Sequence, residues 1–390
     1  MWAQWCKTIE EKSFMHRPAT MTNPHATAQP TESAAIAIIG AGIAGLACAE
    51  LLAQAGQRVE VFDKSRGPAG RMSTKRGEDG ADAQGAGTTW QCDQGAQYFT
   101  ARDADFHAQV QRWVQAGAAA LWPGRIASYG TSHSASGFMP SSTALARYVG
   151  TPRMTAPAHY LMRTLGELAA PATPVQFRLQ STVQALEAQS GAWQLRTLEN
   201  RVQPQSQYYR AVLLAMPAPQ AVALLNPVAP DGAALAASAT MRGCWAVMLR
   251  CSAAVNLSFD GAFIDGGPLS WIARDSSKPG RTGPETWLLH ASAEWSEAHI
   301  EDNAASVCAA LLQAFAALGG PDPASVQATA HRWRYADSAP ALTAGCWWSA
   351  DARLGACGDW LNGGKVEGAW LSGRALARSA LAALAAKQNS

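Results

Sequence analysis

The stretch AIAIIGAGIAGLACAELLAQAGQRVEVFD, residues 35–63, decides the fold. It begins with the apolar run Ala35–Ile39, which is suited to a buried parallel strand. Three glycines follow at positions 40, 42 and 45, and apolar residues at helical spacing continue to Ala55. A second apolar run, Arg58–Phe62, ends at Asp63, 23 residues after Gly40. The stretch therefore predicts a strand–turn–helix–strand unit of the dinucleotide-binding kind.

Each part of this unit has a physical role in holding a dinucleotide. Gly40 permits a tight turn, Gly42 lets the backbone approach a pyrophosphate, and Gly45 lets the helix pack on the strand. The first helical residues offer free N–H groups and a partial positive charge to the phosphates. Asp63 is placed to accept hydrogen bonds from both ribose hydroxyls of an adenosine half.

The composition excludes several classes of function. The chain has 31 Lys and Arg against 29 Asp and Glu, a net charge of +2, which argues against a nucleic-acid partner. The uncharged stretch Ala34–Ala49 is short and carries three glycines, and Ala211–Pro230 carries four prolines, so we expect no membrane span. The eight cysteines form no C-x-x-C pair, which favours reduced thiols in a cytoplasmic protein without a metal site.

The first 33 residues have a different character from the rest of the chain. They carry three basic and three acidic residues and no continuous apolar run, which fits neither a secretory nor a transit peptide. We expect residues 1–33 to be a disordered leader, with Met21 as an alternative start.

The segment after Asp63 indicates which dinucleotide is bound. Residues 63–74, DKSRGPAGRMST, resemble the second fingerprint of amine-oxidase and phytoene-desaturase type flavoproteins, in which the acid is followed by G-x-G-G-R-x-x-[ST]. Ala69 stands where that pattern has a glycine. The resemblance implies that Arg71 lies near the pyrophosphate or the flavin, whereas we expect Arg66 to be a solvated loop charge.

Two further segments resemble the same flavoproteins. Asp93–Phe99, DQGAQYF, matches the D-x-G-[AP]-x-x-F segment that passes the flavin ring, where Gly95 would allow backbone contact. Gly358-Asp359-Trp360 precedes an Ala- and Leu-rich helix that runs to about Ala386. The resemblance implies that Asp359 binds the ribityl or phosphate region. It also implies that a helix starting near Glu367 points its N-terminus at the flavin, where it stabilises negative charge.

In more detail the chain is similar to the bacterial renalase-like flavoproteins. The matching pieces span residues 36–377 and include DQGAQYFTARD, YVGTPRMTA, ATMRGCWAVML, LSWIARDSSKP, WLLHASAEWS and GDWLNGGKVEGAWLSG. The resemblance implies an FAD oxidase of misreduced dihydronicotinamide nucleotides. Its substrates would be the 2- and 6-dihydro isomers of NAD(P)H, returned to NAD(P)⁺ while O₂ becomes H₂O₂. We expect the FAD to be non-covalent, because no His or Cys stands in a flavin-linking motif.

The cofactor residues that we predict from these motifs, and from a main-chain contact of the adenine with the strand near 183, are Gly40, Gly42, Ile43, Ala44, Gly45, Asp63, Lys64, Gly70, Arg71, Gly95, Ala96, Gln97, Val183, Gly358, Asp359, Val366, Glu367 and Gly368.

Other functions remain possible at this stage. Amine oxidases of this type carry a lysine on the strand that faces the flavin, and the strand expected to correspond, Gly243–Arg250, has none. No lysine occurs between Lys75 and Lys278. An amine-oxidase-like enzyme is therefore the alternative, together with a flavin-binding protein without turnover. The second fingerprint and the Asp359 region count against an NAD-dependent dehydrogenase.

Aromatic residues in the second half of the chain are candidates for a substrate pocket, because a planar nicotinamide stacks well on aromatic rings. The candidates are Tyr98, Trp245, Trp271, His290 and Trp333, and for each of them a purely structural role is the competing interpretation. His290 would hydrogen-bond a carboxamide. We expect Arg274 and Lys278 to be solvated loop charges rather than contacts to a substrate phosphate. No catalytic acid or base is required, because the oxidised dihydropyridine is already a stable cation.

The expected fold class is α/β, a two-domain flavoprotein whose Rossmann-like FAD domain is built from separated segments. We place that domain at residues 34–106, 150–240 and 330–386. The substrate domain would comprise residues 107–149 and 241–329, with a mostly antiparallel sheet, because short strand-like runs follow each other there at hairpin spacing.

Overall fold

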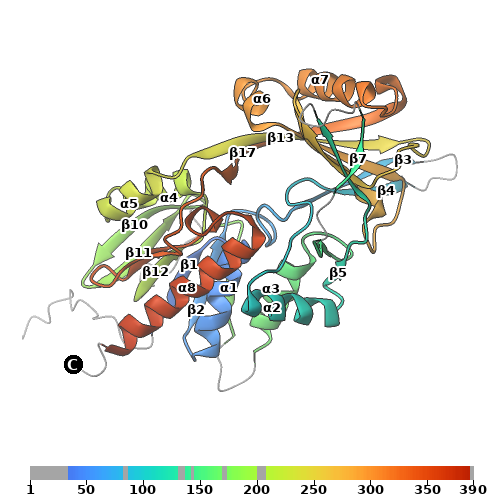
Figure 1. Ribbon diagram of the computed structural model, residues 1–390. Coiled ribbons are helices and arrows are strands. Elements are labelled where there is room, and N and C mark those ends of the chain that lie inside the picture. Colours follow the sequence, from blue (N-terminus) through green and yellow to red (C-terminus); the bar gives the residue numbers. More distant parts are fainter. Residues whose placement is uncertain are drawn as a thin grey trace, which may run out of the picture.

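The computed structural model describes residues 34–81, 87–130, 137–141, 145–168, 174–199 and 208–386. These residues form one six-stranded and one seven-stranded sheet, with helices packed on both (Figure 1). The predicted α/β class with a two-domain arrangement is confirmed. The leader predicted at residues 1–33 lies outside the described residues.

The six-stranded sheet has the order β18-β19-β12-β1-β2-β9. Its strands are β18 (Trp347–Ser349), β19 (Leu354–Ala356), β12 (Ala211–Leu214), β1 (Ile36–Ile39), β2 (Val59–Asp63) and β9 (Gln176–Leu179). All neighbours run parallel except β18. Both faces of β1 are buried, which explains why its sequence is continuously apolar rather than alternating.

Two different layers cover this sheet. On one face lie α1 (Ile43–Gln54), α3 (Ala156–Gly166) and α8 (Lys365–Ala386), which share a core with Ile36 and Ile38. On the other face lie the hairpin of β10 (Val183–Gln189) and β11 (Ala192–Thr197) and the helices α4 (Ala218–Leu225) and α5 (Pro230–Ala237). The βαβ unit predicted from residues 35–63 is therefore the centre of a doubly covered sheet.

The seven-stranded sheet has the order β17-β13-β16-β15-β14-β6-β7. Its strands are β17 (Val326–Ser338), β13 (Met241–Cys251), β16 (Glu285–Ala291), β15 (Leu269–Arg274), β14 (Gly261–Asp265), β6 (Ile126–Gly130) and β7 (Met139–Pro140). Only the β14–β6 pair is parallel, so the prediction of a mostly antiparallel sheet is confirmed. The helices α6 (Ala293–Ala298) and α7 (Ala304–Ala317) accompany it, and α7 packs its Val307, Leu311 and Phe315 into the core on one face.

The opposite face of this sheet carries the hairpin of β3 (Thr74–Ala81) and β4 (Gly87–Asp93). Trp90 and Cys92 of this hairpin pack against Ala246, Met248 and Leu288. The hairpin directly follows the fingerprint turn after β2, so it links the dinucleotide-binding unit to the second sheet.

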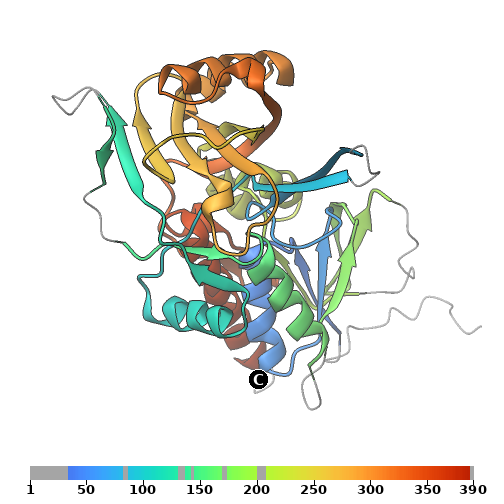
Figure 2. The same ribbon diagram turned by 90° about the vertical axis from the view of Figure 1, so that its right-hand side faces the viewer.

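The predicted domain boundaries stay a prediction, but several elements near them pack differently from what those boundaries suggest. The helix α2 (Ala104–Gln115) and the strands β5 (Ala119–Leu121) and β8 (Tyr148–Gly150) share a core with α1 and α8, although residues 107–149 are predicted to lie in the substrate domain. Figures 1 and 2 both show α2 and α3 beside α1 and α8, away from the seven-stranded sheet. Among the described residues between 107 and 149, only β6 and β7 join that sheet, and the predicted boundary at 330 falls inside β17. The amphipathic pattern of α2 does not reveal which core its apolar side enters.

Within the described residues, no helix has the length and apolar character that crossing a membrane would require. The seven cysteines of the described chain are all free thiols. Cys6 lies outside the described residues.

Candidate functional site

A cavity of about 1960 Å³ lies between the two sheets. It runs from the β1–α1 turn and the end of β2 to the face of the seven-stranded sheet opposite α7. The predicted site residues that line it are Gly40, Gly42, Ile43, Ala44, Asp63, Lys64, Gly70, Arg71, Gly95, Ala96, Tyr98, Val183, His290, Trp333, Gly358, Asp359, Val366 and Glu367.

The glycines of the β1–α1 turn have the separate roles expected of them. Gly40 has φ +118°, and a Cβ at Gly40 would overlap the Ala215 carbonyl group. A Cβ at Gly45 would overlap the Gly40 carbonyl oxygen, so Gly45 serves helix–strand packing. A Cβ at Gly42 would meet nothing within 4 Å, since Gly42 faces the cavity. No side chain caps α1, and its first turn carries no acid. Its free N–H groups therefore suit an anionic ligand such as a pyrophosphate.

Asp63 lies at the end of β2 on the cavity wall. Its Oδ2 accepts a hydrogen bond from the Ala41 amide at 2.7 Å, and its Oδ1 accepts one from the Ser65 amide at 2.7 Å. Each carboxylate oxygen can accept a further hydrogen bond. The side chain is thus oriented by the backbone with remaining capacity for ligand hydroxyl groups.

The fingerprint turn folds over the β1–α1 turn. The Ala69 amide donates to the Ala41 carbonyl oxygen at 3.0 Å. Ala69 has φ +105°, a conformation that favours glycine, and it is only 2% exposed. The alanine that stands where the flavoprotein pattern has a glycine thus adopts a backbone conformation that favours glycine.

Arg71 connects this turn to the C-terminal part of the chain. Its guanidinium forms two hydrogen bonds with the Asp359 carboxylate, at 3.0 and 2.5 Å, and a third with the Ala336 carbonyl oxygen at 3.0 Å. Gly358 precedes Asp359, and its amide donates to Ser372 Oγ of α8 at 3.0 Å. Arg71 and Asp359 therefore form one wall of the cavity together.

The N-terminus of α8 also reaches the cavity through Lys365 and Val366. Glu367 Oε1 accepts hydrogen bonds from the Arg102 and Asp103 amides, at 2.6 and 2.7 Å. Its carboxylate thus fastens α8 to the start of α2. Gly368 does not line the cavity, because it packs against the Asn362 carbonyl group.

The backbone of Gln94, Gly95 and Ala96 lies between the fingerprint turn and the second sheet. The Ala96 amide donates to the Arg71 carbonyl oxygen at 2.9 Å, and a Cβ at Gly95 would overlap that oxygen. On the other side, Trp333 Nε1 donates to the Gln94 carbonyl oxygen at 2.8 Å, and His290 Nε2 lies 3.4 Å from the same oxygen. This segment therefore contacts both the fingerprint turn and the seven-stranded sheet.

The second sheet presents two histidines to the cavity. His290 of β16 and His331 of β17 both pair with Ala246 of β13, so they lie on either side of one small residue. Burial lowers the pKa of His290 to about 4, and burial also lowers the pKa of His331. Both imidazoles are therefore neutral near pH 7. The Trp333 ring lies 4.5 Å from the His331 ring, centroid to centroid, and completes an uncharged aromatic face.

Two predicted pocket residues lie elsewhere. Trp245 points to the opposite face of β13, where its Nε1 donates to the His299 carbonyl oxygen at 2.9 Å. Trp271 is 6% exposed and lies behind Tyr98, with 5.7 Å between the ring centroids. Neither lines the cavity. Since both faces of this sheet are buried, hydrophobicity alone does not distinguish the cavity face.

Three polar residues also depart from their predicted roles. The Gln97 side chain does not line the cavity, because its Nε2 donates to the Asp93 and Gly95 carbonyl oxygens at 2.7 and 3.0 Å. Lys278 is 2% exposed, not solvated, and Arg274 lies over the Trp287 ring beside Asp260 and Glu285. The turn-like sequence around Lys278 suggests exposure, but the nearby Asp275 and the distant Asp93 both pair with its ammonium group in the interior.

Sequence reasoning missed several residues that line the cavity, namely Gln94, Cys244, His331 and Tyr335. A usable signal existed for two of them, because His331 and Tyr335 stand two residues on either side of Trp333 and therefore share its face of a strand. Within the described ranges, no group of His, Cys, Asp or Glu side chains is arranged to hold a metal ion.

Comparison with known proteins supports this description. A family model described as an NAD(P)-binding Rossmann-like domain matches residues 38–116. Residues 38–116 are thus similar to a Rossmann-like domain of the NAD(P)-binding kind. The fold is similar to that of a protein provisionally assigned as a protoporphyrinogen oxidase from Exiguobacterium sp. 255-15, with a TM-score of 0.65 and 12% identity over 89% of this chain and 98% of that chain.

A second similar structure is that of a putrescine oxidase bound to putrescine. Its TM-score is 0.63, with 12% identity over 90% of this chain and 99% of that chain. At these identities the similarity establishes the fold alone, a two-domain fold that this chain shares with both of these proteins.

Proposed function

We propose that the protein is an FAD-dependent oxidase of misreduced dihydronicotinamides. It would convert the 2- and 6-dihydro isomers of NAD(P)H to NAD(P)⁺, while O₂ and a proton take up the hydride equivalent as H₂O₂. The observation that carries this proposal is the cavity itself. It joins a dinucleotide-binding turn at Gly42 to an uncharged aromatic face formed by His290, His331 and Trp333.

The residues present fit FAD. The open space above Gly42 and the uncapped N-terminus of α1 suit its pyrophosphate, and Asp63 suits the hydroxyls of its adenosine ribose. Asp359 and Arg71 offer charged hydrogen-bonding groups further along the same wall, and the N-terminus of α8 supplies a partial positive charge. When bound, FAD supplies a ring system that accepts a hydride.

The face of the second sheet suits a neutral planar substrate. Trp333 offers an aromatic surface to a nicotinamide ring, and the neutral imidazole of His290 can exchange hydrogen bonds with a carboxamide. Oxidation of a dihydropyridine yields a stable cation, so these side chains need only bind and orient the ring. The lysines among the described cavity-lining residues are Lys64 and Lys365, and neither comes from the second sheet.

An amine-oxidase-like enzyme is the second candidate, because the fold is similar to that of a putrescine oxidase. An amine substrate is a cation near pH 7, and it would need a neighbouring anion or deprotonation before it met the uncharged face. A flavin-binding protein without turnover is a third possibility.

Anaerobic mixing of the purified protein with a panel of reductants separates these functions. The panel contains 2-dihydro, 6-dihydro and ordinary 4-dihydro NAD(P)H, together with putrescine and other primary amines. We expect the 2- and 6-dihydro isomers to bleach the flavin rapidly and the 4-dihydro form poorly, because a clamped ring brings only certain carbons within hydride distance. Rapid bleaching by an amine, with inert dihydro isomers, would favour the second candidate. Bleaching by none of them would favour the third.

We propose further that the FAD is held without a covalent bond. Acid precipitation should then release all the yellow colour into the supernatant, whereas colour retained in the pellet would contradict this. We also propose a cytoplasmic location, because all seven described cysteines are free thiols, and cell fractionation would test it.

A further inference from the structure

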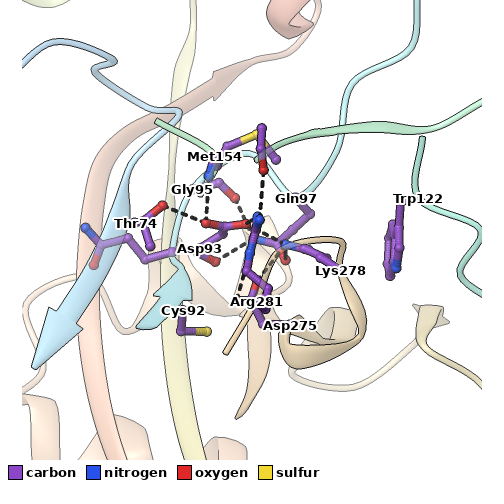
Figure 3. A network of polar contacts seen from close by, with 12 residues as sticks. Thr74, Cys92, Asp93, Gly95, Gln97, Trp122, Met154, Asp275, Lys278 and Arg281 are labelled. Carbon is purple, nitrogen blue, oxygen red and sulfur yellow. Dashed lines mark hydrogen bonds and ion pairs between the residues drawn. The ribbon is translucent and has the colours of Figure 1, made fainter. Parts of the chain in front are cut away.

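Four charged side chains form a buried cluster beneath the cavity wall. Lys278 Nζ lies 3.0 Å from Asp93 Oδ2 and 2.7 Å from Asp275 Oδ1, and Arg281 lies 2.5 Å from Asp93 (Figure 3). The side chains of Lys278, Asp93 and Asp275 are 0% exposed, and that of Arg281 is 2% exposed. The charges of two carboxylates and two cations thus balance each other in a place that water does not reach.

A buried cluster of this kind is poor evidence for a role in stability alone. Removing charges from water is expensive, and apolar side chains of similar volume often serve stability equally well. Burial would raise the pKa of Asp93, but Lys278 and Arg281 outweigh burial and hold it below its ordinary value. Asp93 is therefore a carboxylate whose ionised form is stabilised by its two cationic neighbours.

The cluster holds both ends of the segment that lines the cavity. Asp93 directly precedes Gln94, Gly95 and Ala96, and Gln97 directly follows them. Besides its bond to Asp93, Lys278 Nζ donates to Gln97 Oε1 at 3.2 Å. The Gln97 amide group in turn donates to the Asp93 and Gly95 carbonyl oxygens. One ammonium group thus fixes the residues on either side of the cavity-lining turn.

The same contacts join the seven-stranded sheet to the part of the fold that lies outside it. The other partners of the Asp93 carboxylate, Thr74 Oγ1 at 2.6 Å and the Met154 amide at 3.1 Å, lie outside the seven-stranded sheet. Lys278 and Arg281 instead follow β15 of that sheet, beyond the short helix η1 (Asp275–Ser277). Arg281 also donates to the Gly150 carbonyl oxygen at 2.8 Å. The cluster therefore sets where the segment stands relative to the sheet that carries His290 and Trp333.

We propose that Lys278 is a positioning residue for the bound cofactor. By holding Asp93 and Gln97, it places the Gln94–Ala96 backbone at the junction of the cofactor and substrate parts of the cavity. The proposal rests on the proposed flavin-dependent function, but it adds a residue that does not itself line the cavity.

The first experiment compares Lys278→Met with Asp260→Asn. Asp260 accepts hydrogen bonds from Arg125 and lies near Arg274 in the same sheet, and among the described residues it has no bond to the 93–97 segment. Both variants should lower Tm. We expect only Lys278→Met to raise the FAD dissociation constant, by about tenfold, and to shift the visible absorption of bound FAD.

The outcomes separate this proposal from the proposed function. Wild-type protein that binds no FAD contradicts the proposed function. Wild-type protein that binds FAD, with a Lys278→Met variant that matches Asp260→Asn in dissociation constant and spectrum, overturns the positioning role while the proposed function stands.

Two further variants distinguish positioning from folding. Gln97→Leu removes the hydrogen bond from Lys278 to the end of the Gln94–Ala96 segment without changing the charge balance. It should therefore shift the flavin spectrum with a smaller loss in Tm. It also carries the test if Lys278→Met does not fold, and an unchanged spectrum and dissociation constant in Gln97→Leu would overturn the proposal. Adding Asp275→Asn to Lys278→Met restores charge balance, and we expect it to recover Tm but not the flavin properties. Recovery of both would show that the cluster acts through folding alone.

Discussion

Arg71 and Asp359 are 288 residues apart in the chain, yet they form a bidentate ion pair on the cavity wall. Arg71 also bonds the Ala336 carbonyl oxygen at the end of β17. A planar guanidinium fits a carboxylate through two parallel hydrogen bonds, which fixes orientation as well as distance. Arg71 therefore joins the fingerprint turn, the end of β17 and the segment just before α8 at one point.

Replacing Asp359 by Asn should weaken both the fold and cofactor binding. The substitution leaves the Arg71 cation with a neutral partner, and the loss of a charged hydrogen-bonding pair costs about 1.5–3 kcal/mol. Because Arg71 is 28% exposed, we expect the lower end of that range for stability. Thermal unfolding and FAD titration measure the two effects. Arg71→Lys, which keeps the charge but loses the two-pronged geometry, should show the same direction. Wild-type values in both variants would contradict a shared role.

Replacing Asp63 by Ala should weaken FAD binding. Two ribose hydroxyls would lose a charged acceptor, which corresponds to about 1.5–3 kcal/mol, or roughly a 10- to 150-fold larger dissociation constant. Asp63 also orients the Ala41 and Ser65 amides, so Tm should fall slightly as well. Asp63→Asn keeps one acceptor oxygen, so its FAD dissociation constant should lie between those of the wild type and Asp63→Ala. An unchanged dissociation constant in Asp63→Ala would show that another residue binds the ribose.

Replacing Ala69 by Gly should stabilise the protein. Ala69 has φ +105°, where a side chain costs about 1–3 kcal/mol, whereas the greater freedom of glycine in the unfolded chain costs about 0.4–1 kcal/mol. We therefore expect a net gain of about 1 kcal/mol in the free energy of unfolding, measured by denaturant titration. Ala158→Gly, in the ordinary helical backbone of α3, serves as control and should destabilise by about 1 kcal/mol. A loss of stability in Ala69→Gly would contradict the inference that the backbone at Ala69 is strained.

The stability of the protein should fall as the pH drops from about 6.5 to about 4. Burial lowers the pKa of His290 from 6.5 to about 4, so in this range the unfolded chain binds a proton that the native protein does not. At pH 5 this difference amounts to about 2 kcal/mol of lost stability relative to pH 7.5. Urea unfolding at both pH values should show a smaller loss for His290→Asn. His331 shifts in the same direction and remains in both proteins, so an equal loss in wild type and variant would contradict the assignment to His290.

The sequence alone was sufficient for the βαβ unit and for most of its neighbours. Gly40, Gly45 and Asp63 act through contacts within one supersecondary unit, and their spacing follows from its geometry. Four strands of the second sheet, β13, β14, β15 and β16, were also recognisable, because short apolar runs between turns depend on local pattern. The strands β17, β6 and β7 were not predicted. Local sterics and periodicity carry this information, so no distant contact was needed.

The pairing of segments that are distant in the chain could not be predicted from local sequence pattern. Cys244 and Trp245 stand on opposite faces of β13, and alternation shows that they differ but not which one meets the cavity. Apolar side chains are buried on both faces of the sheet, so hydrophobicity alone does not show which face meets the cavity. The register of β13 with β16 and β17 determines which face meets the cavity. It brings His290 and His331 to either side of Ala246.

Lys278 shows this division most clearly. In the sequence it stands in the turn-like run Asp275–Gly280, where a lysine is expected to be solvated. The fold brings Asp93 from 185 residues away to within 3.0 Å of its ammonium group, beside Asp275. Sequence determined the dinucleotide-binding unit because its glycines and its acid act within about thirty residues. Tertiary structure determined the burial of Lys278, because a buried charge needs opposite charges around it and Asp93 and the surrounding interior come from distant segments.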